Sequence, residues 1–94
     1  MFKLHVNLNG RQYTVSANPG QTVLDALREA AAIIPDLAEQ LKNADPARVR
    51  IEDGLATPPT PRELLALDVG LLDCGFRLAG EAVPRGDMAI TAPA

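Results

Sequence analysis

The sequence predicts a single α+β domain over residues 1–94, built on a mixed sheet with one main helix. Three observations lead to this class. The first sixteen residues alternate between apolar and polar side chains, which is typical of strands. Residues 23–31 carry the apolar stripe of an amphipathic helix. The rest of the chain holds short strand and helix patterns without a linker or a repeat, so we expect one core.

The opening segment is predicted to form a β-hairpin. Every second residue over 2–8 is apolar, while polar side chains occupy the positions between them. Asn9 and Gly10 follow, and this pair tolerates the two positive φ angles of a type I′ turn. Tyr13 and Val15 continue the alternation in a returning strand.

The first helix is expected over residues 23–31. Thr22 is a suitable N-cap, and Asp25 lies three residues further on, as in a capping box with a shortened acidic partner. Pro35 and the two isoleucines before it end this helix. Residues 36–43 are rich in helix formers and predict a short second helix.

The second half of the chain alternates between turn residues and short regular segments. A proline-rich loop over residues 57–61 leads into a helix that begins at Pro61, with Thr60 as its N-cap and Glu63 at its third position. The other expected elements are a strand over 48–52, a short extended segment over 76–79 and a final strand over 88–91.

The composition excludes several kinds of site. One cysteine, Cys74, cannot form an internal disulfide or a cysteine-only metal site within one chain. One histidine, His5, leaves little for a zinc site or a histidine-based catalytic triad. Nine Lys and Arg against twelve Asp and Glu give a net charge of −3, which is the wrong sign for a surface that binds nucleic acid. With 3% aromatic residues, the core has to be aliphatic.

The sequence shows no pattern for export or for crossing a membrane. Its first residues alternate, whereas a signal peptide has a continuous apolar run. No apolar stretch approaches the ~18–20 residues that span a bilayer. Because export is not indicated and the cysteine is unpaired, we expect a cytoplasmic protein.

Two stretches together resemble two-iron two-sulfur ferredoxin domains. Residues 4–29 resemble their opening, a hairpin and then a helix beginning Thr-Val-Leu-Asp-Ala-Leu. Further similarity lies in Arg-Val-Arg-Ile at 48–51, Thr-Pro-Pro-Thr-Pro-Arg-Glu-Leu-Leu at 57–65, Gly-Phe-Arg-Leu-Ala at 75–79 and Val-Pro-Arg-Gly-Asp-Met at 83–88. Within this family the sequence most resembles the N-terminal ferredoxin domain of bacterial corrinoid-protein reactivating ATPases. The resemblance implies a β-grasp (ferredoxin-like) fold, a mixed sheet of about four to five strands crossed by one main helix.

The cysteines that bind the cluster in this family are missing here. Family members hold the cluster with three closely spaced cysteines after the helix and a fourth further along the chain. Alignment on the Arg-Val-Arg-Ile motif places Ala38, Ala44 and Ala47 at the three loop positions and Gly80 at the fourth. Residues 39–43 favour a helix where the family has a glycine-rich loop. The resemblance therefore implies a ferredoxin scaffold without its cluster, so we expect no cofactor and no cluster-dependent electron transfer by a single chain.

Several single residues could carry chemistry but have simpler explanations. Cys74 is not at a cluster position; we expect a partly buried, inert thiol in a turn, with a covalent or intermolecular role as the alternative. His5 lies on the polar face of the first strand, where a solvated or hydrogen-bonded histidine is favoured over a metal ligand. Arg77, Asp73 and Asp87 are expected in turn caps and ion pairs.

The segment that replaces the cluster loop could form a docking surface. Acidic residues flank it, as in surfaces that meet basic partners, although an ordinary solvated face is the favoured explanation for them. Leu37 and Leu41 share one helix face and either pack inward or contact a partner; inward packing is favoured because the lost cluster leaves space to fill. We expect residues 36–47 to meet residues 78–84. The candidate partner-binding residues are Asp36, Glu39, Leu41, Asp45 and Glu81.

The sequence thus predicts a clusterless ferredoxin-like protein that binds a larger protein. The expected partner is a redox or cofactor-dependent enzyme, of which this chain would be an accessory or small subunit. We do not expect the chain itself to be an enzyme, because it has no nucleophile set and no phosphate-cradling glycine loop. The alternative is a carrier or chaperone that uses the vacated cluster site as a pocket for a small molecule or cofactor.

Overall fold

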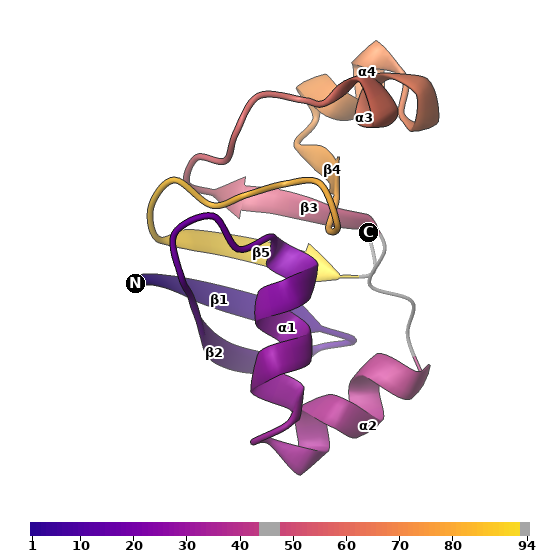
Figure 1. The fold of residues 1–94 in the computed structure, drawn as a ribbon. Coiled ribbons are helices and arrows are strands. Elements are labelled where there is room, and N and C mark those ends of the chain that lie inside the picture. The colour runs from indigo at the N-terminus through magenta and orange to yellow at the C-terminus, as the bar shows by residue number, and fades with distance from the viewer. Residues whose placement is uncertain (44–47, 93–94) are drawn as a thin grey trace.

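Five strands form one mixed sheet in the computed structural model, which describes residues 1–43 and 48–92 (Figure 1). The strands are β1 (Phe2–Leu8), β2 (Arg11–Ala17), β3 (Arg48–Asp53), β4 (Phe76–Leu78) and β5 (Met88–Ala92). Their order is β2-β1-β5-β3-β4. The first and last strands, β1 and β5, are parallel neighbours, while the other neighbouring pairs are antiparallel.

Four helices accompany this sheet in the described residues: α1 (Val23–Ala31), α2 (Pro35–Asn43), α3 (Pro61–Ala66) and α4 (Val69–Asp73). Helix α1 crosses one face of the sheet, and α2 lies next to the C-terminal end of α1 (Figure 1). Helices α3 and α4 lie beyond β3 and β4. A hairpin crossed by one helix, with parallel first and last strands, confirms the expected β-grasp (ferredoxin-like) arrangement. Within the described ranges, no helix has the length and apolar character needed to cross a bilayer.

The N-terminal hairpin forms as its turn chemistry predicts. Asn9 and Gly10 have φ angles of 53° and 82°, so both adopt the left-handed conformation of a type I′ turn. Leu8 pairs with Arg11 across that turn, and the register continues to Phe2 opposite Ala17.

The core lies between α1 and the sheet. The N-cap Thr22 accepts a hydrogen bond from the Asp25 amide at 3.1 Å, as predicted. From there α1 turns its buried residues toward the inward side chains of the strands. The buried apolar cluster consists of Leu4, Val6, Leu8, Val15, Ala17, Val23, Ala26, Leu27, Leu37, Val49, Ala79, Ala82, Met88, Ile90 and Ala92.

The second half of the chain confirms one helix start and adds one helix. Thr60 and Glu63 form the expected reciprocal capping box, with Pro61 in the first turn of α3. Helix α4 was not predicted, because it has only five residues and one of them is Gly70, a poor helix former. It forms because the Asp68 side chain accepts a hydrogen bond from the Leu71 amide at 2.8 Å.

Candidate functional site

The four residues that the ferredoxin resemblance places at cluster-ligand positions fall into two groups. Ala38 is half-buried in α2, and Gly80 is exposed in the turn after β4. Ala44 and Ala47 lie outside the described residues, as does the candidate Asp45. Where the family has its cluster loop, the described part of this chain therefore forms a helix.

Helix α2 is anchored to the core by leucines. Leu37 is fully buried within the apolar cluster, and Leu41 is half-buried and packs against it. The prediction of inward packing is confirmed for Leu37. Leu41, proposed as a partner contact, exposes only part of its side chain.

A polar contact also fixes the start of α2. Asp36 accepts hydrogen bonds from the Tyr13 hydroxyl at 2.6 Å and from Arg11 Nη1 at 2.8 Å. The hydrogen bond from Tyr13, reinforced by Arg11, holds the pKa of the Asp36 carboxyl below its ordinary value. The same hydrogen bond raises the pKa of the Tyr13 phenol. Asp36 therefore links α2 to β2, while Glu39 is exposed further along the helix.

The last candidate, Glu81, lies in another part of the fold. Its carboxylate is 3.5 Å from Arg62 Nε of α3, whereas Asp36 is bonded to β2. The turn that carries Glu81 is hydrogen-bonded to the start of α1, where the Val23 and Leu24 amides donate to the Ala82 and Ala79 carbonyls at 3.0 and 2.9 Å. Asp36 and Glu81 therefore make separate contacts, Asp36 with β2 and Glu81 with α3.

An ion pair between α3 and β4 was not anticipated from the sequence. Glu63 is 0% exposed, and its carboxylate accepts hydrogen bonds from Arg77 Nε at 2.6 Å and Arg77 Nη2 at 2.7 Å. The amides of Leu78 and Thr60 also donate to it. Burial favours the neutral acid, yet these hydrogen bonds outweigh it and hold the pKa of Glu63 below its ordinary value.

Of the expectations for neighbouring residues, one is confirmed and one needs correction. Arg77 forms an ion pair, as expected, and its partner is Glu63. The Asp87 carboxylate accepts a hydrogen bond from the Lys3 amide at 2.8 Å. Cys74 caps the C-terminus of α4 and is exposed, not partly buried. It is exposed because its short helix lies outside the apolar cluster, beyond the edge of the sheet.

Three apolar side chains on α3 and α4 are left in contact with solvent. Leu64 is 56% exposed, Leu65 91% and Val69 69%. We call these three residues the α3–α4 apolar surface. Glu63 of α3 and Leu67, which follows that helix, are both buried. This segment therefore buries one charged side chain while three apolar side chains remain exposed.

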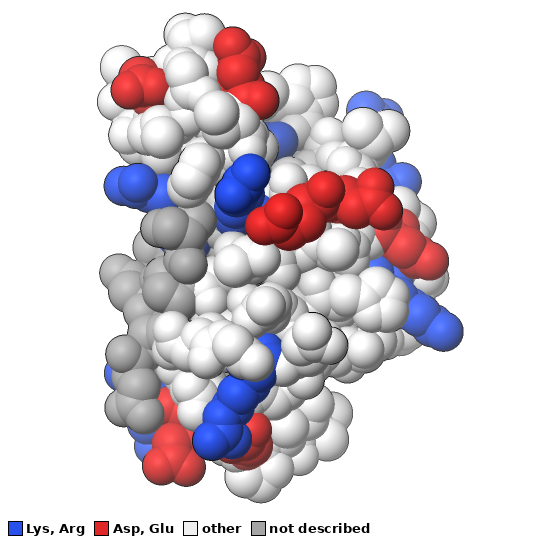
Figure 2. Space-filling view, turned by 180° about the vertical axis from the view of Figure 1, so that it is seen from behind, with Lys and Arg blue, Asp and Glu red and all other residues white. Residues whose placement is uncertain are grey.

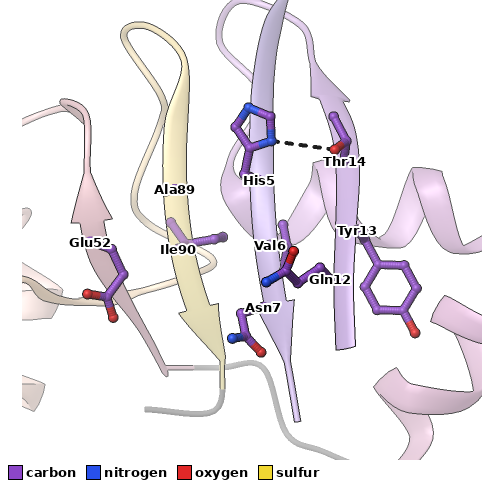
Figure 3. A pocket seen from close by; sticks show the side chains of 9 residues that line it. All are labelled: His5, Val6, Asn7, Gln12, Tyr13, Thr14, Glu52, Ala89 and Ile90. Carbon is purple, nitrogen blue, oxygen red and sulfur yellow. Dashed lines mark hydrogen bonds between the residues drawn. The ribbon is translucent and has the colours of Figure 1, made fainter. Parts of the chain in front are cut away.

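The sheet face opposite α1 carries a shallow hollow of about 440 Å³. His5, Asn7, Gln12, Thr14 and Glu52 contribute its polar groups (Figure 3). His5 Nδ1 lies 3.4 Å from Thr14 Oγ1, as expected of a hydrogen-bonded histidine. Acidic side chains form a row across this face (Figure 2). In the described residues, no group of three or more His, Cys, Asp or Glu side chains could hold a metal ion.

Comparison with known proteins identifies the fold. No protein-family model and no curated protein sequence matches the chain. A cytochrome P450 reductase from Amycolatopsis, GcoB, is similar over 100% of this chain and 26% of its own, with 20% sequence identity and a TM-score of 0.66. A ferredoxin from Trichomonas vaginalis is similar over 95% of this chain and 98% of its own, with 17% identity and a TM-score of 0.61. The chain thus spans about a quarter of the reductase and nearly all of the ferredoxin, and it has the ferredoxin-like fold.

Proposed function

We propose that this chain is a ferredoxin-like protein without an iron–sulfur cluster that serves as a protein-binding accessory or small subunit of a redox or cofactor-dependent enzyme. The observation that carries the proposal is a ferredoxin-like fold whose single cysteine, Cys74, aligns with none of the four cluster positions. A cluster of this class needs four protein ligands, which one chain cannot supply here. The scaffold keeps surfaces for protein contact without the electron carrier.

The class of partner is suggested by the similar structures. One is a ferredoxin, and the other is a reductase in which a region of this fold makes up about a quarter of the chain. This fold therefore occurs joined to a larger redox protein. In our proposal the present chain makes a comparable contact with its enzyme.

The α3–α4 apolar surface is the best candidate for that contact. Its three apolar side chains are exposed within six residues of one another, and apolar groups exposed close together are typical of protein-interaction sites. Leu65, the most exposed of the three, has no part in the core. Arg62 of α3 forms an ion pair with Glu81 of the turn after β4, which adds polar groups at the border of the surface. Asp36 is held at β2 by Tyr13 and Arg11, away from this ion pair, so we propose Glu81 rather than Asp36 as part of the contact.

Replacing Leu65 with glutamate is expected to weaken enzyme binding by about tenfold or more, because a charge would be buried at the centre of the contact. Tagged wild-type and Leu65→Glu proteins are expressed in the source organism, and co-purifying proteins are quantified by mass spectrometry. The wild type is expected to retain a redox or cofactor-dependent enzyme that the variant loses. Calorimetry with the purified enzyme then measures the change in affinity.

Leu55→Glu is the matched control, because Leu55 is 75% exposed and lies outside α3 and α4. It should bind the enzyme as the wild type does. A wild-type protein that never retains such an enzyme would contradict the proposed function. Equal binding by Leu65→Glu would show that the enzyme contacts a different surface.

The carrier alternative gains no support from the described hollows. The larger one lies on the sheet face opposite α1, and a second one of about 310 Å³ lies beside β2. Neither is lined by Ala38 or Gly80, the described positions of the former cluster site.

A further inference from the structure

Strand β2 forms a long edge of the sheet. It contains seven residues and has β1 on one side only. Leu8 and Arg11 close the two-residue turn, so they form a hydrogen-bonded pair, and such pairs recur at every second position of an antiparallel ladder. The backbone N–H and C=O groups of Gln12, Thr14 and Ser16 consequently point away from β1.

Two sequence features that usually prevent pairing with another chain are missing from this edge. Residues 12–17 contain no proline and no charged side chain. The opposite edge differs, since β4 has only three residues and continues directly from α4. Of the two edges, β2 is therefore the one suited to accept a further strand.

An apolar hollow accompanies the same edge. It has a volume of about 310 Å³ and is lined in part by Val15, Ala30 and Ile34. Met1 and Ile33 also line it and are 82% and 79% exposed. A strand added to β2 would place alternate side chains over these apolar groups.

We propose that the added strand is β2 of a second copy of this chain, paired antiparallel about a two-fold axis at Thr14. Thr14 would face Thr14 of the partner subunit, and Gln12 and Ser16 would face each other across the axis. This register uses all three outward-pointing residues, each in a pair that exchanges two backbone hydrogen bonds. A register centred on residue 16 would instead pair Thr14 and Gln12 with residues 18 and 20, beyond the end of β2 at Ala17.

Side-chain pairing across this interface is also self-complementary. Tyr13 would face Val15 of the partner subunit, an aromatic and β-branched pair, and the two threonines form another favourable pair. Arg11, the only charged residue of β2, would face Ala17 of the partner subunit, so no like charges oppose each other. The result is one continuous sheet with both α1 helices on the same face.

Charge substitutions at the two-fold axis test this pairing and its register. Thr14 is exposed, so Thr14→Lys and Thr14→Glu are compatible with the fold. Each should weaken self-association by at least about tenfold, because two like charges would face each other at the axis. Mixing the two variants should restore a dimer, since opposite charges then face each other. Sedimentation velocity at submillimolar protein concentration measures each state.

His5→Lys is the control, because it adds the same charge to the same sheet face one strand further from the axis. This variant should remain dimeric like the wild type. A monomeric wild type at submillimolar concentration would overturn the proposal. The proposal would also be overturned if the equimolar mixture of the two variants stayed monomeric. It would fail likewise if Leu65→Glu dissociated the dimer and Thr14→Lys did not. This proposal does not depend on the proposed function.

Discussion

Replacing Arg77 with methionine is expected to lower the free energy of unfolding by about 3–5 kcal/mol. The methionine keeps most of the buried side-chain volume but leaves the Glu63 carboxylate 0% exposed and without its cation. The loss is large because an unpaired buried carboxylate has given up its hydration without a compensating charge. Urea denaturation of the wild type and of Arg77→Met at neutral pH measures the difference.

The pH dependence separates the charge effect from lost packing. In the wild type the pKa of Glu63 is lowered, so its contribution to stability is present above the ordinary pKa and is lost as the pH falls through the folded value. In Arg77→Met, burial should raise the pKa of Glu63 above its ordinary value. The folded variant then takes up a proton before the unfolded chain does. Its deficit relative to the wild type should therefore shrink as the pH is lowered.

A double variant provides the control for this pair. Glu63→Gln in the Arg77→Met background removes the buried charge, and glutamine still suits the third position of a capping box. The double variant should unfold at a higher urea concentration than Arg77→Met alone. If both variants are equally destabilised at every pH, the unpaired charge is not the cause.

Replacing Leu37 with alanine is the second substitution expected to have a large effect, a loss of about 2–5 kcal/mol. Leu37 is fully buried and is the residue through which α2 enters the apolar cluster. Truncation removes transfer free energy and leaves a cavity between α2 and the core. Thermal or urea unfolding measures the loss, and detachment of α2 would also change the environment of Tyr13, the only tyrosine.

Leu65→Ala is the matched control, because the same truncation at a side chain that is 91% exposed should change stability very little. Leu37→Ala tests whether the segment in place of the cluster loop is a packed part of the fold. An effect no larger than that of Leu65→Ala would contradict this account of α2.

Features that depend on neighbouring residues in the sequence were predicted well. Asn9 and Gly10 fix their turn through local backbone preference, and the hairpin register follows from it. Thr22 and Thr60 cap their helices by reaching amides three residues away. Such contacts are visible as spacing in a sequence, because both partners lie within one turn.

Contacts between distant segments could not be predicted in the same way. Glu63 was recognised only as a capping residue. Nothing in the nearby sequence indicates that Arg77, fourteen residues later, would form a buried ion pair with it. Asp36 was expected on an exposed acidic face, and nothing in the local sequence indicates that Arg11 and Tyr13, more than twenty residues earlier, donate hydrogen bonds to it. Polar residues look solvent-exposed in a sequence until the fold places a partner beside them.

We propose that this ferredoxin-like fold is complete without an iron–sulfur cluster. The most direct measurement is anaerobic incubation of the purified protein with iron and sulfide, followed by desalting, iron analysis, visible absorption and thermal unfolding. We expect no retained iron, no visible absorption and an unchanged unfolding temperature, because Ala38 and Gly80 offer no thiolate and Leu37 already anchors the intervening helix. The proposal would be contradicted if the protein bound stoichiometric iron, absorbed visible light and unfolded at a higher temperature, and if Cys74→Ser lost all three properties.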